Sequence, residues 1–166
     1  SANLPFVSID RYFKEDVVYV TSDNYHGGEL AAEELIKKGC QHLAYLAAVA
    51  PQKNDTLKRK DGFVHYAKEN GHSVDIFERP EPILYYDCFF NDFFSAHPQT
   101  DGILAMNDQT ALILLNYLER INKKVPDEIQ VVGYDGFHYF SGYQTSLTTV
   151  KQPIRQMAET AVLTLL

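Results

Sequence analysis

The sequence predicts an α/β fold, a doubly wound and mostly parallel sheet with helices on both faces. Apolar runs of strand length alternate along the chain with segments whose apolar residues recur at helical spacing. Glycine, proline, asparagine and aspartate stand between these segments, where turns and helix ends need them. Hydrophobic residues make up 45% of the 166 positions and charged residues 22%, which is typical of a folded globular protein.

The expected strands are short apolar runs, several of them rich in β-branched residues and followed by a polar or turn residue. The run at 73–77 alternates apolar and polar residues, whereas those at 42–48 and 102–106 are apolar almost throughout, as in buried strands. In chain order the seven expected strands cover 4–9, 17–20, 42–48, 73–77, 102–106, 129–132 and 147–150.

The expected helices carry an apolar stripe at i, i+3, i+4 spacing and have recognisable ends. Gly39 and Gly71 stop the first two helices, Pro98 stops the third, and Asn107 and Asp108 can cap the fourth. The five helices cover 28–38, 56–70, 86–96, 108–121 and 153–165. The resulting order, β-β-α-β-α-β-α-β-α-β-β-α, is that of a parallel sheet covered on both sides.

Charge and cysteine usage exclude several classes of protein. The formal net charge of −7 and the scattered basic residues make nucleic-acid binding by this chain alone improbable. Cys40 and Cys88 are far apart and form no CxxC, which favours a reduced, cytoplasmic protein. There is no apolar run long enough for a membrane span and no signal-peptide pattern. The abrupt start, with a strand at 6–9 and nothing before it, suggests that upstream residues of a longer protein are missing.

Common enzymatic signatures are absent from the sequence. It contains no GxGxxG, no GxxxxGK[ST] and no GxSxG, and its six histidines never fall at HxxxH spacing. No histidine pairs locally with cysteine or a carboxylate in a metal-binding pattern. We therefore expect no metal, no cofactor and no enzymatic activity.

Four short polar residues follow closely on predicted strands: Asp10, Asp23, Asn107 and Asp135. Because parallel strands end at the same edge, these side chains would line one rim, where open α/β sheets hold ligands. Carboxylates and amides suit a ligand that carries hydroxyl groups. The alternative is that Asp23 and Asn107 are helix N-caps and Asp135 a turn residue.

Arg59 and Tyr85 are further candidates. Arg59 opens a predicted helix and could be an ordinary surface residue, or it could donate paired hydrogen bonds to adjacent hydroxyls or an anionic group in a pocket. Tyr85, or its neighbour Tyr86, follows a proline-rich loop and could form an aromatic pocket wall or simply pack in the core.

Five segments together resemble the lactose-repressor/galactose-repressor family of bacterial transcription regulators, in its effector-binding domain of the periplasmic-binding-protein type I fold. In order and at the family's spacing they are FVSIDR at 6–11, SDNYHGG at 22–28, RKDGF at 59–63, DGILAMNDQTA at 101–111 and VPDEIQVVGYDG with LTTVKQP within 125–153. The resemblance covers nearly the whole chain.

The resemblance implies a division of the chain. Residues 1–21 would belong to a partial N-terminal subdomain, 22–146 to a C-terminal subdomain, and 147–166 to a return segment. The DNA-binding helix-turn-helix would lie outside this chain. By position, the implied ligand-binding residues are Asp10, Ser22, Asp23, Arg59, Tyr85, Asn107 and Asp135, and the implied homodimer-interface residues are Leu112 and Tyr143.

The function implied is that of a non-enzymatic, cytoplasmic regulator whose DNA affinity changes when a small effector binds between the subdomains. A sugar is the expected effector, and a phosphorylated or purine effector stays open because Arg59 also suits anions. The first rival is a solute-binding protein of a sugar transport system with the same fold. The second is an enzyme on a doubly wound sheet.

Overall fold

The computed structural model describes residues 6–10, 12, 14, 16–49, 55–80, 83–136 and 147–166. Within them, helices and strands follow one another in the predicted order. The predicted α/β class is confirmed by a five-stranded parallel sheet flanked by helices.

The central sheet has the strand order β4-β3-β5-β6-β7, and every neighbouring pair is parallel. Its strands are β3 (Leu43–Val49), β4 (Val74–Pro80), β5 (Gly102–Ala105), β6 (Gln130–Asp135) and β7 (Thr148–Lys151). Because all five run the same way, the loops that follow them meet at one edge of the sheet.

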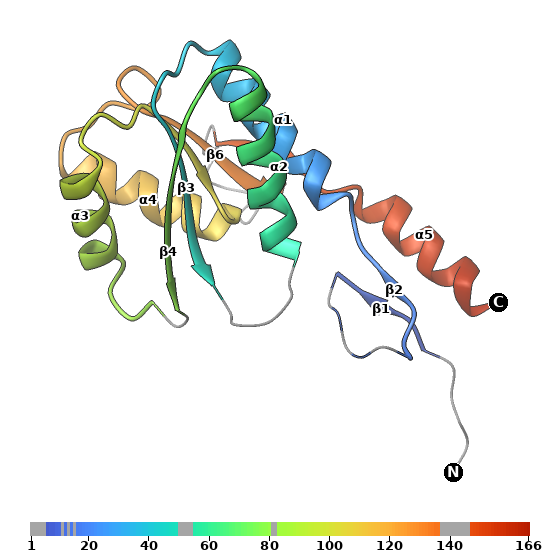
Figure 1. Ribbon diagram of the computed structural model, residues 1–166. Coiled ribbons are helices and arrows are strands. Elements are labelled where there is room, and N and C mark those ends of the chain that lie inside the picture. The colour runs from blue at the N-terminus through green and yellow to red at the C-terminus, as the bar shows by residue number, and fades with distance from the viewer. Residues whose placement is uncertain are drawn as a thin grey trace.

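Helices cover both faces of this sheet (Figure 1). One face packs against α1 (Asn24–Lys37) and α2 (Asp55–Glu69), and the other against α3 (Tyr86–Ala96) and α4 (Asp108–Arg120). Neighbours on a strand point to opposite faces, so Tyr45 joins the first core and Leu46 the second. The second core is rich in aromatic residues. Among its members, Phe89, Phe90 and Phe93 of α3 are fully or nearly fully buried.

Two glycines let α1 and α2 approach closely. A Cβ on Gly28 would collide with the backbone carbonyl of Arg59, and a Cβ on Gly62 would collide with that of Tyr25. The first helix begins at Asn24, directly after its cap Asp23 and four residues before the start predicted from the apolar stripe. Gly28 falls in its opening turns because only glycine permits this contact with α2.

A smaller sheet lies apart from the central one. The strands β1 (Ser8–Ile9) and β2 (Tyr19–Val20) pair in parallel, and α5 (Ile154–Leu165) lies beside them (Figure 1). Both strands are shorter than predicted. Asp10 thus follows a strand of the smaller sheet, which corrects the expectation that the polar residues at strand ends share a single sheet.

The described residues include no helix that is both long and apolar enough to cross a membrane. In the same part of the chain, no group of three or more His, Cys, Asp or Glu side chains is arranged to hold a metal ion. Cys40 is buried, Cys88 is exposed, and neither forms a disulfide.

Candidate ligand-binding site

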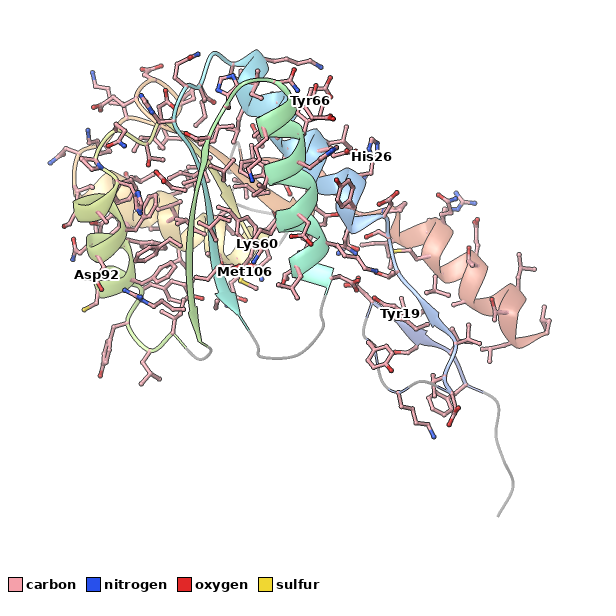
Figure 2. The ribbon with its side chains drawn as sticks, in the orientation of Figure 1. Tyr19, His26, Lys60, Tyr66, Asp92 and Met106 are labelled. Carbon is pink, nitrogen blue, oxygen red and sulfur yellow. The ribbon has the colours of Figure 1, made fainter. Side chains whose placement is uncertain are left out.

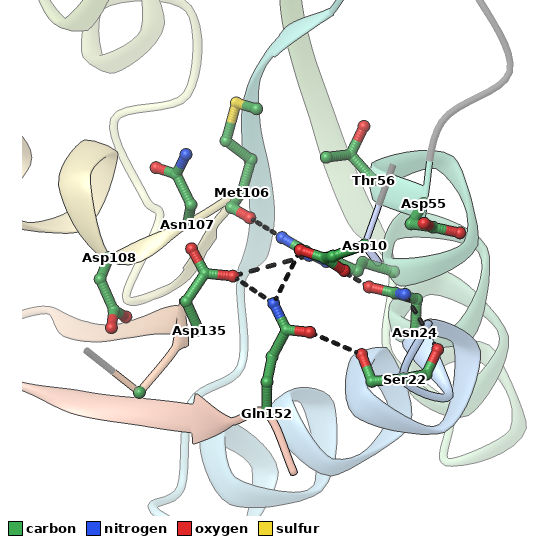
Figure 3. Close-up of polar contacts among 12 residues, drawn as sticks. Asp10, Ser22, Asn24, Asp55, Thr56, Met106, Asn107, Asp108, Asp135 and Gln152 are labelled. Atoms are coloured by element: carbon green, nitrogen blue, oxygen red, sulfur yellow. Dashed lines mark hydrogen bonds and ion pairs between the residues drawn. The ribbon is translucent and has the colours of Figure 1, made fainter. Parts of the chain in front are cut away.

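Arg59 is buried at the edge of the sheet where the strands end. Its Nε donates to Asn24 Oδ1 at 2.6 Å, and its Nη1 donates to the backbone carbonyl of Met106 at 2.7 Å (Figure 3). The guanidinium lies 3.7 Å from the centre of the Tyr134 ring, in cation–π contact. These partners come from α1, from the residue that follows β5, and from β6, so one side chain joins three parts of the fold. The alternative of a surface arginine is wrong.

Asp135 ends β6 and faces Arg59. Its Oδ1 lies 3.6 Å from Arg59 Nη2, and its side chain is 17% exposed. Its backbone has a φ of 120°, in the region that side chains rarely adopt, and Gly136 follows with a φ of 73°. Asp135 is therefore a turn residue and also a member of the cluster around Arg59.

Burial raises the pKa of Asp135 above its ordinary value of 3.8, and the charges of Asp108 and Asp10 raise it further. The hydrogen bond from Gln152 and the charge of Arg59 act in the opposite direction. The direction of the net shift shows that burial and neighbouring carboxylates outweigh the arginine.

Gln152, just after β7, connects the cluster to the N-terminal segment. Its Nε2 donates to Asp135 Oδ1 at 2.8 Å and lies 3.5 Å from Asp10 Oδ2, and its Oε1 accepts from Ser22 Oγ at 2.8 Å (Figure 3). The side chain is buried, with 5% of the residue exposed. One amide thus bridges the end of β6, the end of β1 and the segment before α1.

A second set of contacts continues from Asp10 toward α2. Thr21 Oγ1 donates to Asp55 Oδ2 at 3.1 Å and lies 3.5 Å from Asp10 Oδ1. Tyr19, which lies on β2 and is labelled in Figure 2, donates to the same Asp55 oxygen. Burial, followed by the hydrogen bond to Asp55, raises the pKa of Tyr19 to about 12. Asp55 in turn lies 3.5 Å from the exposed Lys58 ammonium.

Asn107 and Asp108 connect β5 to α4. The side chain of Asn107 accepts from the backbone N–H of Thr110 at 2.8 Å and caps the helix. Asp108 is buried and accepts from Thr149 Oγ1 at 2.5 Å. Thr149 also accepts from the backbone N–H of Gly136 at 3.3 Å. Asp108 therefore holds the end of β7 against the turn that carries Asp135.

The structure brings together four of the residues that the sequence singled out: Asp10, Ser22, Arg59 and Asp135. The carboxylates of Asp10 and Asp135, the amide of Gln152 and the guanidinium of Arg59 then lie close together, where the strand ends of the central sheet meet the segment after β1. Such a set accepts and donates hydrogen bonds in the directions that adjacent hydroxyl groups need. The arrangement suits a polyhydroxylated ligand.

The other candidates lie elsewhere or have a structural role. Asp23 caps α1 by accepting from the backbone N–H of His26 at 3.0 Å, and Asn107 caps α4, so the cap alternatives are confirmed for both. Tyr85 immediately precedes α3 and is 74% exposed. Leu112 is half-buried on α4, and Tyr143 lies outside the described residues.

Several side chains of the site were missed from the sequence, among them Asn24, Asp55, Tyr134 and Gln152. The rule that found Asp135 could have found Gln152, because Asp135 ends β6 and Gln152 directly follows β7. Nothing local marks Asn24 as a partner of Arg59, since their contact depends on the close approach of α1 and α2.

Comparisons with known proteins identify the family and agree with the fold. Residues 32–166 match the model of the family described as periplasmic binding protein-like domain. The sucrose operon repressor of Pediococcus pentosaceus is 32% identical over 98% of the chain, and the ribose operon repressor of Halalkalibacterium halodurans is 32% identical over 92%. The chain spans about half the length of these relatives, 50% and 46% respectively.

Solved structures give the same picture. A periplasmic binding protein/LacI transcriptional regulator from Alkaliphilus metalliredigens, complexed with D-xylulofuranose, aligns with a TM-score of 0.81 at 26% identity over 98% of this chain and 61% of its own. A LacI family regulator from Arthrobacter in complex with lactose aligns with a TM-score of 0.80 at 26% identity, over 97% and 60%.

Proposed function

The chain belongs to the periplasmic binding protein-like domain family, and from that premise we propose that it is the effector-binding part of a bacterial transcription regulator. Its similarity to operon repressors and LacI family regulators runs along nearly the whole chain. The proposed effector is a sugar, because two of the structurally similar regulators hold D-xylulofuranose and lactose.

The observation that carries the proposal is the buried contact set of Arg59, Asp135 and Gln152. Its hydrogen bonds and ion pair connect the end of β6 and the residue after β7, two strands of the central sheet, with Asp10 after β1. Burying polar groups of this kind costs free energy unless they form hydrogen bonds or ion pairs. Here the pairing leaves carboxylate lone pairs that a ligand hydroxyl can use.

The proposed mechanism is a population shift between two arrangements of two subdomains. Residues 1–21 and 147–166 would belong to one subdomain and 22–146 to the other, so Gln152, Asp10 and Asp135 would lie where the two meet. A ligand that bonds to groups of both subdomains binds one arrangement better than the other. The differential affinity is what would change DNA affinity in the whole protein.

The same fold also serves transport proteins, but the relatives that match nearly the whole chain are named operon repressors, which favours a regulator. We propose further that the protein is cytoplasmic, has no enzymatic activity, and binds operator DNA only through a segment outside this chain. A homodimer would form through α4, with Leu112 at the interface, and through Tyr143, which follows β6 in the sequence.

The test is sugar-dependent DNA binding by the protein as its gene encodes it. Fluorescence anisotropy with DNA from the promoter region of the same gene would be measured with and without each sugar of a panel that includes ribose, sucrose and lactose. We expect at least one sugar to change the DNA dissociation constant about fivefold or more, which corresponds to the usual range of coupling free energies.

The matched variants are Asp135→Asn and Asp92→Asn. Asp135→Asn keeps the shape of the side chain and an acceptor for Gln152 but removes the charge. The sugar concentration needed for the half-maximal response should therefore rise about tenfold or more. Asp92 lies on α3, away from the cluster (Figure 2), and its substitution should leave the response unchanged. An unaltered response in Asp135→Asn would remove the site from the mechanism.

A further inference from the structure

The positive charge of Arg59 is already engaged by the protein. Of its five N–H groups, one donates to Asn24, one to the carbonyl of Met106, and one points toward Asp135 at 3.6 Å. Its guanidinium is also held against the face of Tyr134. Two N–H groups lie outside these contacts, so Arg59 can contribute hydrogen bonds to a ligand, but its charge is balanced by Asp135.

Among the residues that the structure describes, carboxylates outnumber cations in the contacts around Arg59. The amide of Gln152 lies between Asp135 and Asp10, and the hydroxyl of Thr21 lies between Asp10 and Asp55. These three carboxylates form a row along the edge of the site. Among the described residues, the contacts of this row include two cations, Arg59 and Lys58, and the Lys58 side chain is 58% exposed.

The behaviour of Asp135 supports this balance of charge. A carboxyl beside an arginine ordinarily has a lowered pKa. Here burial, with further contributions from the charges of Asp108 and Asp10, raises the pKa of Asp135 in spite of Arg59 and of the hydrogen bond from Gln152. Burial is the main cause of this shift, so a further anionic group held at this place would also lose its hydration.

Resting on the function proposed above, we infer that this site selects a ligand that carries hydroxyl groups and no negative charge, and that it rejects the phosphate ester of the same sugar. Ionised carboxylates accept hydrogen bonds from neutral hydroxyls and bind them well. A phosphate ester carries a charge of about −1.5 to −2 at pH 7 and would meet the row of Asp10, Asp55 and Asp135. Placing like charges together is also how proteins exclude a wrong ligand.

The experiment compares each neutral sugar with its phosphate ester by isothermal titration calorimetry on the protein as encoded. The pairs are ribose with ribose 5-phosphate, glucose with glucose 6-phosphate, and fructose with fructose 6-phosphate, and sucrose and lactose are added as neutral sugars. For a sugar that binds, we expect the phosphate ester to bind at least about a hundredfold more weakly. An acetyl ester at the same hydroxyl controls for size and should bind more tightly than the phosphate ester.

A variant tests whether the carboxylates cause the rejection. The double substitution Asp10→Asn with Asp55→Asn removes two negative charges and keeps side-chain shape. The ratio of the two dissociation constants, ester over sugar, should fall by about tenfold, even if the affinity for the neutral sugar also changes. Asp92→Asn removes an exposed charge on α3 and should leave the ratio as it is. Circular dichroism would confirm that each variant is folded.

The outcomes separate this inference from the function on which it rests. If a phosphate ester binds as tightly as its neutral sugar, or more tightly, the inference is overturned while the regulator proposal stands. If the ester is rejected but the ratio is the same in the double variant, the role given to the carboxylates is overturned. If neither sugars nor esters bind, the proposed sugar-binding function itself is contradicted.

Discussion

Replacing Arg59 by lysine keeps the positive charge and removes the geometry that makes this residue the centre of the site. Lysine has one ammonium group in place of a planar fork, so it can reach only one of the partners that Arg59 now holds. The Nε bond to Asn24 at 2.6 Å and the Nη1 bond to Met106 at 2.7 Å cannot both survive. The stacked contact over Tyr134 at 3.7 Å is weakened too.

The magnitude follows from these contacts. A hydrogen bond from a charged group contributes about 1.5–3 kcal/mol, and a desolvated cation–π contact adds roughly 0.5–2 kcal/mol. Losing one such bond and part of the ring contact should lower the free energy of unfolding by about 2–4 kcal/mol. For a chain of this size that is a fall of roughly 5–15 °C in Tm.

Urea unfolding followed by circular dichroism measures the loss, with Arg79→Lys as the matched control. Arg79 also lies over an aromatic ring, at 4.7 Å from the Phe77 centroid, and is 3.5 Å from Asp92, but both charged side chains are about half exposed. Its substitution should cost less than about 1 kcal/mol. Equal losses in the two variants would refute the reasoning that burial and geometry make Arg59 structural.

Two further predictions concern the charge of the site and the proposed interface. Because the pKa of Asp135 is raised in the folded protein, ionisation of this side chain destabilises the unliganded fold as the pH rises above 3.8. The Asp135→Asn variant should therefore have a higher Tm than the unsubstituted protein at pH 7. This difference in Tm should shrink as the pH falls toward 3.8. A thermal scan across pH 3.5–8 checks this, and a lower Tm at pH 7 would contradict it. Leu112→Asp should shift sedimentation toward monomer whereas Asn116→Asp, on the exposed side of α4, should not; an unaltered dimer in Leu112→Asp would remove this interface.

The order of helices and strands could be predicted because it depends on local patterns. Apolar periodicity located every element, and Asp23 and Asn107 were recognised as possible caps from their position alone. The start of α1 was misplaced, although its cap Asp23 was recognised, because Gly27 and Gly28 are poor helix formers. Gly28 stands inside the helix to admit the backbone of α2, and that contact is visible only once both helices are packed.

The site could be predicted in part for the same reason. Asp10 and Asp135 follow strands, so the rule that ligands bind at strand ends found them. Whether Arg59 is exposed or buried could not be decided from its helix, because the answer depends on Asn24, Met106 and Tyr134, which come from other elements.

The most direct test is a crystal structure of the protein as encoded, with the sugar that changes its DNA affinity. The proposed site requires a ligand hydroxyl within hydrogen-bond distance, about 2.7–3.2 Å, of the carboxylate of Asp135, and a second within reach of Arg59. A groove of about 310 Å³ between α1 and β7, lined in part by Leu30, Glu33 and Val150, offers a different location. A sugar found in that groove, with Asp135 and Arg59 free of ligand, would contradict the account.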